Sequence, residues 1–251
     1  MNIKPTAPPL NVSVVVDYEN MRRTALKVYA QHEVERPIML DPFALAQRIV
    51  SARAANPNDG HRLVLRRVIV VRAEALPADR VRFARSQMQH EVWRSRSDTV
   101  EIRTTPLHTT YEYDADGARV QRDGRPVVLG HSECGVDVMV ALSALDEARR
   151  ADTNIVIVAS HDRDLCPTFA FVRAERAKAE SACWSGGVVD VRPLNAPYGE
   201  PSLWSNHLSL TDYTASIDPT DYTDVPQRYW PTPPRPHHTR DMDTTIERGA
   251  R

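Results

Sequence analysis

The stretch that most constrains the fold runs from Ile155 to Leu165 and reads I-V-I-V-A-S-H-D-R-D-L. Its first half is a short apolar run, which is typical of a buried strand. Two carboxylates, Asp162 and Asp164, follow it directly. The valine-rich residues 12–16 repeat the arrangement, with Asp17 after them. Because ligands of open parallel sheets bind beyond the carboxyl ends of the strands, the two stretches predict a shared acidic pocket.

Apolar strand patterns alternate with helical patterns along most of the chain. Strands are predicted at residues 12–17, 64–73, 99–105, 154–159 and 187–192. Helices are predicted at residues 20–30, 41–55, 77–95, 133–149 and 164–180, and a short last helix at 203–210. This alternation is typical of βαβ crossovers. It predicts an α/β fold, a three-layer sandwich with a five-stranded, mainly parallel sheet.

An insertion and a tail interrupt this order. Asp116-Gly117 is a hairpin turn signal between residues 111–114 and 118–121, and Asp123-Gly124 is a second turn before apolar residues 127–129. We predict a flexible β-hairpin insertion near the pocket. From Thr214 the chain is polar and rich in proline, so a disordered or partner-bound tail is predicted. The predicted units are a domain at 12–213 and a tail at 214–251.

The composition sets the class of protein. The chain has 251 residues, of which 41% are hydrophobic and 26% charged, enough for one substantial core. A formal net charge of -1 gives no overall attraction to nucleic acid or membrane. Three distant cysteines predict neither a zinc ribbon nor a disulfide framework. With no apolar signal segment and no run of membrane-spanning length, a cytoplasmic protein without a membrane partner is expected.

Carboxylates occupy the predicted strand ends and helix starts: Asp17, Glu133, Asp137, Asp162 and Asp164. Asn20 adds an amide one helical turn from Asp17, and Ser132 is the predicted cap of the helix that carries Glu133 and Asp137 on one face. Converging carboxylates repel one another, and a divalent cation removes that repulsion. Mg²⁺ accepts carboxylate oxygens without a His or Cys cage. One or two such ions could activate water and orient a phosphodiester.

Each acid also has a simpler explanation. Aspartate caps helices and forms turns, and for any single one of these residues that is the commoner role. The set together favours a site, because capping does not explain why the acids gather beyond strands that are neighbours in a doubly wound sheet.

Three blocks carry a resemblance to a known family: V-V-V-D-Y-E-N-M at 14–21, E-C-G-V-D-V at 133–138 and V-A-S-H-D-R-D-L at 158–165. In this order they resemble the signature blocks of NYN domains, which belong to the PIN-like nuclease superfamily. The resemblance spans residues 12–210, and residues 203–213 resemble the family's terminal segment. It implies a five-stranded parallel sheet and Mg²⁺- or Mn²⁺-dependent hydrolysis of single-stranded or structured RNA.

Carried over to this sequence, the resemblance implies a catalytic pocket of Asp17, Asn20, Asp137, Asp162 and Asp164. The first metal ligands would be Asp17, Asp137 and Asp162, with Asp164 completing the shell. Asn20 would position substrate or a ligand water, and Glu133 is a secondary candidate.

The chain departs from the family pattern at two positions. Cys134 stands where the family has lysine, which removes a phosphate contact. His161 stands where the family has glycine, and its imidazole could ligate, donate to phosphate or fill space. A thiol nucleophile at Cys134 with His131 as its base lacks an orienting third group. No G-x-G-x-x-G follows the first strand, which argues against a dinucleotide fold.

Arginines are frequent between the second and third strands: Arg66, Arg67, Arg72, Arg80, Arg82, Arg85, Arg94, Arg96 and Arg103. On a common face they would follow a phosphate backbone, and scattered they would form a solvated surface. Tyr111 and Tyr113 could stack on bases or be ordinary strand residues.

The expected function is a metal-dependent endoribonuclease. The alternatives are a catalytically weak or inactive NYN module that binds RNA or protein, and a phosphatase on the same acidic sheet. A homo-oligomer is left open.

Overall fold

The computed structural model describes residues 8–29, 38–55 and 61–232. These residues form an α/β fold around an all-parallel sheet of six strands in the order β10-β9-β8-β1-β2-β3. The strands are β1 (Leu10–Asp17), β2 (Leu63–Glu74), β3 (Val100–Pro106), β8 (Ile155–Ala159), β9 (Lys178–Trp184) and β10 (Trp204–Leu208). The predicted fold class is confirmed, with one strand more than expected.

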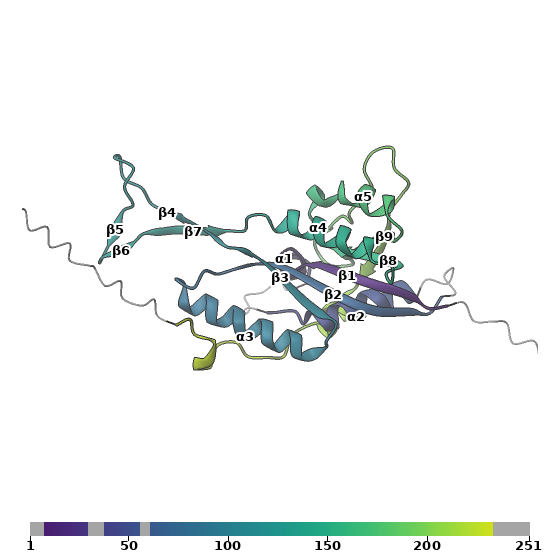
Figure 1. Ribbon diagram of the computed structural model, residues 1–251, viewed down its shortest axis with the longest axis horizontal. Coiled ribbons are helices and arrows are strands. Elements are labelled where there is room, and N and C mark those ends of the chain that lie inside the picture. Colours follow the sequence, from purple (N-terminus) through teal and green to yellow (C-terminus); the bar gives the residue numbers. More distant parts are fainter. Residues whose placement is uncertain (1–7, 30–37, 56–60, 233–251) are drawn as a thin grey trace, which may run out of the picture.

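Helices cover both faces of the sheet (Figure 1). One core joins it to α1 (Tyr18–Tyr29), α2 (Pro42–Ala54), α3 (Arg80–Arg96) and α6 (Leu210–Ala215). The other joins it to α4 (Val136–Arg149) and α5 (Thr168–Ala174). The central strand β1 feeds both cores: Val14 and Val16 lie in the first and Val15 in the second. A strand buried on both faces explains its nearly continuous valine run.

Helix α2, which belongs to the crossover between β1 and β2, begins as its sequence predicts. Asp41 accepts hydrogen bonds from the backbone N–H groups of Phe43 and Ala44, at 2.9 and 3.1 Å. Pro42 occupies the first helical turn, where its missing N–H is not needed.

The chain after Asp164 differs from the prediction. Residues 163–165 form a short 3-10 turn (η1, Arg163–Leu165), α5 is only seven residues long, and β9 lies at 178–184 instead of 187–192. Gly187 is packed so closely on α1 that a Cβ there would lie 2.1 Å from Cγ1 of Val28. The predicted last helix at 203–210 is also wrong, since residues 204–208 form the edge strand β10.

The insertion forms the predicted hairpin, with different strands. β4 (His108–Tyr111) pairs antiparallel with β7 (Val128–Ser132), and the resulting arm extends away from the sheet (Figure 1). At its end β5 (Gln121–Arg122) pairs with β6 (Arg125–Pro126) around Asp123 and Gly124, whose φ angles are 52° and 71°. Two successive positive φ angles are what a tight hairpin turn requires. The other predicted turn is closed by a bridge between Tyr113 and Arg119.

The predicted tail at 214–251 begins too early. Ile217 forms a β-bridge with Leu40, and Asp218 is buried beneath α3, where it accepts a hydrogen bond from Trp93 Nε1 at 2.9 Å. A 3-10 turn (η2, Gln227–Tyr229) follows. Residues 214–232 are therefore part of the folded body. The predicted arm at 1–7, loop at 31–37, turn at 56–60 and remainder of the tail at 233–251 lie outside the described residues.

Within the described ranges, no helix combines the length and apolar character needed to cross a membrane.

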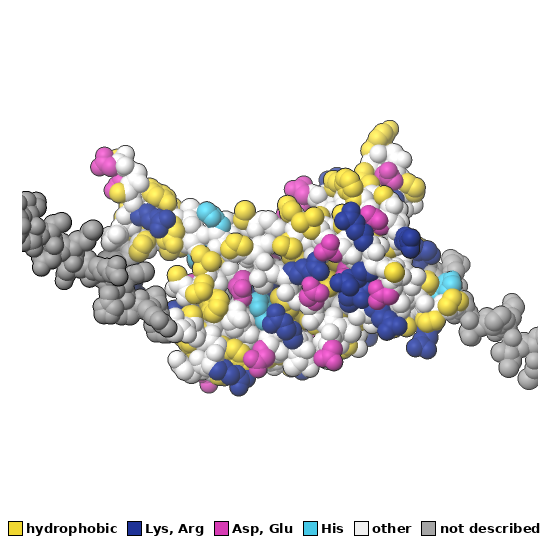
Figure 2. Space-filling model, viewed as in Figure 1, with side chains coloured by type: hydrophobic (Ala, Val, Ile, Leu, Met, Phe, Trp, Pro, Cys, Tyr) yellow, Lys and Arg dark blue, Asp and Glu magenta, His cyan; other side chains and the backbone are white. Residues whose placement is uncertain are grey.

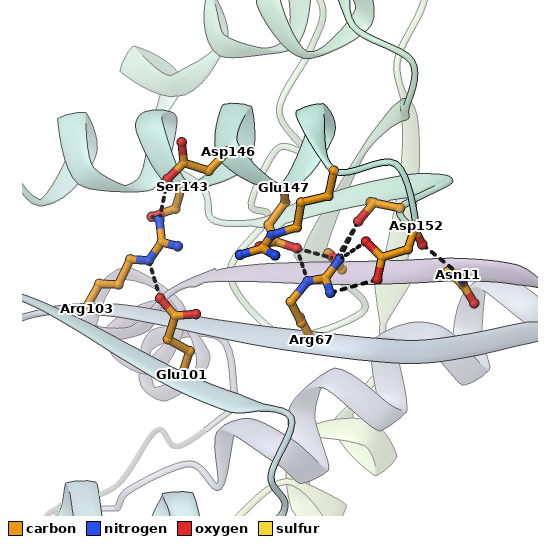
Figure 3. A network of polar contacts seen from close by, with 11 residues as sticks. Asn11, Arg67, Glu101, Arg103, Ser143, Asp146, Glu147 and Asp152 are labelled. Carbon is orange, nitrogen blue, oxygen red and sulfur yellow. Dashed lines mark hydrogen bonds and ion pairs between the residues drawn. The ribbon is translucent and has the colours of Figure 1, made fainter.

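A polar network fastens α4 to the sheet (Figure 3). The carboxylate of Glu147 is fully buried and accepts hydrogen bonds from Ser13 on β1, Arg67 on β2 and Arg150 at the helix end. Arg67 also pairs with Asp152 at 3.0 Å. A second arginine, Arg103 of β3, contacts Ser143, Asp146 and Glu101. Polar groups at the helix–sheet interface are therefore matched by partners from both layers.

We expect Glu147→Ala to lower the free energy of unfolding by roughly 3 kcal/mol, because it leaves the Arg67 guanidinium and the Ser13 hydroxyl without their buried acceptor. Asp146→Ala is the matched control, one residue away on the same helix. Its carboxylate is 57% exposed, so its loss should cost less than about 1 kcal/mol. Urea unfolding at pH 7 measures both, and equal losses would contradict the role given to Glu147.

Candidate functional site

The carboxyl ends of β1 and β8 mark the point where the strand order reverses. The chain passes from β1 to β2 on one side, whereas β8 and β9 lie on the other. This switch point is where open α/β sheets bind ligands. Asp17 is the last residue of β1, and Ser160 follows β8 directly.

Asp17 is the most perturbed acid at this edge. Its side chain is buried, with Ser160 Oγ donating to Oδ2 at 2.8 Å and the backbone N–H of Asn20 donating as well. Burial raises the pKa of Asp17 to about 7, against the hydrogen bond from Ser160. The carboxylates of Asp137 and Glu133 add to the rise.

Asp137 comes from the other side of the site. It lies in the first turn of α4, which begins after Gly135 in the left-handed region (φ 75°). Ser132 therefore does not cap α4, and Glu133 precedes the helix, so the predicted shared helical face of Glu133 and Asp137 is wrong. Burial raises the pKa of Asp137, and the nearby carboxylates of Asp162 and Asp164 raise it further.

Asp162 and Asp164 lie in the turn that follows β8. The backbone N–H of Asp162 donates to Ser160 Oγ, and Asp162 Oδ1 accepts from the backbone N–H of Asp164, both at 3.0 Å. Asp162 thus also has the capping role that the simpler explanation assigns. Asp164 is exposed.

His161 is bound to the protein on three sides. Its backbone N–H donates to Asn20 Oδ1 at 2.8 Å, and its Nε2 accepts from the backbone N–H of Trp184 at 3.1 Å. Its Nδ1 lies 3.4 Å from the carbonyl oxygen of Arg192. Burial lowers the pKa of His161. Of the three roles considered for this imidazole, these contacts favour a neutral spacer that ties the turn after β8 to β9.

A cavity of about 940 Å³ brings most of the predicted site residues together; we call it the acidic cavity. Its acidic and amide lining consists of Asp17, Asn20, Glu133, Asp137 and Asp162. Asp164 is not among the lining residues, although its charge acts on Asp137. Three segments distant in sequence therefore contribute carboxylates to one space.

The sequence analysis missed two basic residues of α1 that line this cavity, Arg23 and Lys27, although it named Arg82. Asn20, Arg23, Thr24 and Lys27 of α1 line it, as does Arg82 of α3. The α1 residues follow the i, i+3, i+4, i+7 spacing of a single helical face, a signal present in the sequence. Ser160, which holds Asp17, was also missed, and its only signal is its position directly after the strand.

The carboxylates of the acidic cavity are of the chemical type that binds a hard divalent cation, but they stand too far apart to surround one. Within residues 8–29, 38–55 and 61–232, no three His, Cys, Asp or Glu side chains stand close enough to hold a metal ion. Mg²⁺ commonly uses one or two carboxylates and keeps several waters. The raised pKa values of Asp17 and Asp137 mark anionic forms that a cation would stabilise. Asp17, Asp137 and Asp162 are the candidates for holding such an ion.

The arginines predicted to form a groove are mostly engaged elsewhere. Arg67 and Arg103 join the sheet to α4, and Arg66 donates to Asn11. Arg72 is buried between Tyr18 and Trp93. The face shown in Figure 2 carries acidic and basic side chains intermixed. Of the nine arginines, Arg82 lines the acidic cavity.

The two tyrosines of the arm, Tyr111 and Tyr113, lie in different environments. The guanidinium of Arg119 lies 4.3 Å from the ring centroid of Tyr111, whereas Tyr113 is 54% exposed. Base stacking by either ring stays a prediction.

The cysteine alternative gains no support from its base. His131 Nδ1 lies 3.2 Å from Thr109 Oγ1, and its Nε2 lies 4.0 Å from the Asp79 carboxylate. Both ring nitrogens therefore have neighbours other than Cys134, which is exposed.

Comparisons with known proteins assign no family to the chain. No family model matches it, and no curated protein matches it. One solved structure is similar, that of VPA0982, a protein of unknown function from Vibrio parahaemolyticus RIMD 2210633. The two chains are 15% identical, the match covers 72% of this chain and 84% of that one, and the TM-score is 0.40.

The raised pKa of Asp17 predicts a pH-dependent stability of the metal-free protein. The folded state keeps the Asp17 proton up to about pH 7, whereas the unfolded chain loses it near pH 4. The contribution to stability is therefore lost as the pH rises through this window. Asp17→Asn removes the loss, so we expect its free energy of unfolding to exceed that of the wild type increasingly from pH 4 to pH 8, by on the order of 4 kcal/mol.

Urea unfolding in the presence of a chelator measures this difference. Ser160→Ala is the companion variant. Because it removes a hydrogen bond that stabilises the Asp17 carboxylate, it should raise the pKa of Asp17 and extend the pH range of the stability loss to higher pH. Parallel stability curves for Asp17→Asn and wild type would contradict the assigned pKa.

Proposed function

We propose that this protein is a metal-dependent endoribonuclease of the NYN type. The observation that carries the proposal is the convergence of Asp17, Asp137 and Asp162 on one cavity at the switch point of the sheet. Each belongs to a different one of the three sequence blocks that resemble NYN domains. A structural role for any single acid does not account for three distant segments delivering carboxylates to the same space.

The residues suggest how the reaction would proceed. A bound Mg²⁺ or Mn²⁺ would supply Lewis acidity and an activated water for in-line attack on a phosphodiester. Asp17, fixed by Ser160 and the Asn20 backbone, would hold the ion together with Asp137 and Asp162. Asn20 is a positioning residue, because its Oδ1 accepts from His161. Asp164 would act through its charge and through the turn it shares with Asp162.

Basic residues opposite the acids support a phosphodiester substrate. Arg23 and Lys27 lie on the cavity-lining face of α1, and Arg82 faces the same space from α3. Because Arg23 already pairs with Glu133, Lys27 and Arg82 are the residues that can supply the cationic contact that the family's lysine would have made at the position of Cys134. A cavity of about 940 Å³ is also large enough for more than one nucleotide.

One observation favours the competing function, a module that binds RNA or protein without cleaving it. The carboxylates as they stand do not group tightly enough to hold an ion among the described residues. In an active site a cation has to draw them together, and in a degenerate site it would not.

We expect Asp17→Asn and Asp137→Asn each to lower the rate of RNA cleavage at least about 100-fold, because each removes a negatively charged ligand of the ion. The matched control is Asp146→Asn on the same helix as Asp137, whose exposed carboxylate contacts Arg103. It should retain wild-type cleavage. Gel assays of single-stranded RNA with Mg²⁺ or Mn²⁺ measure the rates. Full activity in either site variant would contradict the assignment, and cleavage of a generic phosphomonoester in place of RNA would favour the phosphatase.

Metal binding is testable without activity. A ligand that binds the folded state at about 100 times its Kd adds roughly 2.7 kcal/mol to the free energy of unfolding. We therefore expect Mn²⁺ to raise the melting temperature of the wild type by on the order of 5 °C at pH 8. Asp17→Asn and Asp137→Asn should lose most of this rise, whereas Asp146→Asn should keep it. An unchanged melting temperature of the wild type would favour the non-catalytic module.

A further inference from the structure

A second cavity, of about 600 Å³, adjoins the acidic cavity. The two share Arg23, Arg82, Leu107 and Glu133 in their linings. The second cavity lies between α1, α3 and the segment 217–223. We call it the arginine cavity, because Arg22, Arg23, Arg72, Arg82 and Arg85 line it.

The acids of this cavity already have partners. Glu19 is held by Arg22 at 2.7 Å and by Arg72 at 3.6 Å. Glu133 pairs with Arg23 at 3.7 Å.

The carboxylate of Asp218 is satisfied in the same way. It accepts hydrogen bonds from Trp93 Nε1 and the Tyr222 hydroxyl, and Arg96 lies 3.5 Å away. Asp221 accepts from the backbone N–H and the hydroxyl of Thr223. These acids are therefore poorly placed to neutralise a further arginine.

Arg85 is the exception among the cations. Within the described part of the chain it has no hydrogen bond or ion pair, and its Nε is buried. Its neighbour Arg82 contacts Asp79 at 3.4 Å through a side chain that is 54% exposed. Arg72 Nε in the same cavity also lacks an acceptor, but Arg72 is held by Glu19 and Gln89, whereas Arg85 has no such partner among the described residues. Leaving the partly buried Arg85 guanidinium without an acceptor is costly, so its position on the cavity wall favours a ligand that brings an anion.

The remaining wall of the cavity is apolar. Ile38, Met39, Leu107 and Ile217 line it. Ser86 and Gln89 of α3 add polar groups beside the arginines. An apolar surface next to an unpaired guanidinium matches a ligand with one flat apolar part and one anionic part.

We propose that the arginine cavity binds a nucleoside monophosphate unit. The phosphate lies against Arg85 and Arg82, since a guanidinium offers two parallel N–H donors to phosphate oxygens. The base lies against the apolar wall. In the nuclease, the arginine cavity would be the subsite for the nucleotide that flanks the cleaved bond, and this role rests on the proposed function. Arg82 belongs to both cavities and would contact the strand where it passes from one to the other.

Binding is tested without metal or turnover. Uridine 5′-monophosphate, uridine and a short uridine RNA are titrated into the full-length protein by calorimetry in the presence of a chelator. We expect the monophosphate to bind at least about tenfold more tightly than the nucleoside, and Arg85→Gln to remove this difference. Arg80→Gln is the control: Arg80 lies on the same helix but stacks on Trp230, outside the cavity. It should bind as the wild type does.

Arg85→Gln is suited to the test because Arg85 has no partner to lose among the described residues. The melting temperature of this variant should therefore equal or exceed that of the wild type. Tighter binding of the RNA than of the monophosphate assigns the cavity to a strand, and equal binding assigns it to a free nucleotide; both support the site. Unchanged affinity of Arg85→Gln for both ligands, or equal binding of uridine and its monophosphate, overturns it.

The two proposals fail separately. Phosphate-dependent binding that Arg85→Gln abolishes, in a protein that cleaves no RNA, would leave the arginine cavity standing and refute the nuclease. If Arg85→Gln cleaves RNA with an unchanged KM, the nuclease proposal would stand and the arginine cavity would be refuted as its subsite. Asp17→Asn should bind the monophosphate as the wild type does, because Asp17 lines only the acidic cavity of the two.

Discussion

The structure depends on confining negative charge at one edge of a buried sheet. Asp17 ends the central strand, almost without contact to solvent, and other carboxylates lie near enough to raise its pKa. Packing makes the position unavoidable, because the valines that precede Asp17 are buried on both faces and carry it to the switch point. Ser160 and the Asn20 backbone compensate only part of the burial. Under the proposed function, a bound cation would neutralise this carboxylate and offset the cost of its burial.

The parts of the fold that sequence predicts well are those in which apolar periodicity is the dominant force. The predictions of β1, β2 and β8 are correct within a few residues because their buried runs are apolar, and that of β3 is correct because its residues alternate in character. β9 was missed because Glu180 and Ser181 interrupt its pattern; both are buried, and Glu180 is matched by Arg53 from α2. Segment 217–222 was missed for a related reason. It is fixed by the polar side chain of Asp218 beneath Trp93, and such a partner cannot be identified from local composition.

The candidate site was also predictable only in part. The acids at strand ends were found from their position, and all but Asp164 line the acidic cavity. The arginines that could bind a ligand were not predictable. The number of arginines in a segment does not show which of them are already paired with a carboxylate. Arg67 and Arg103 connect layers, whereas Arg85 has no acceptor in the described part of the chain, and nothing in their sequence neighbourhoods separates these two conditions. Only the three-dimensional pairing of charges distinguishes a structural arginine from one available to a ligand.

The two adjoining cavities place negative and positive charge in different spaces, which bears on how an acidic site could accept an anionic substrate. A cluster of carboxylates repels a phosphodiester, so an acidic site needs positive charge that reaches the substrate without neutralising the acids. An arginine among the carboxylates would pair with them and lose its value for binding. Here Glu133 and Arg23 pair at the boundary of the two cavities, and beyond them Arg85 forms no ion pair with an acid of the described residues. Under the two proposals, this separation of charge would keep the carboxylates available to a cation and the Arg85 guanidinium available to phosphate.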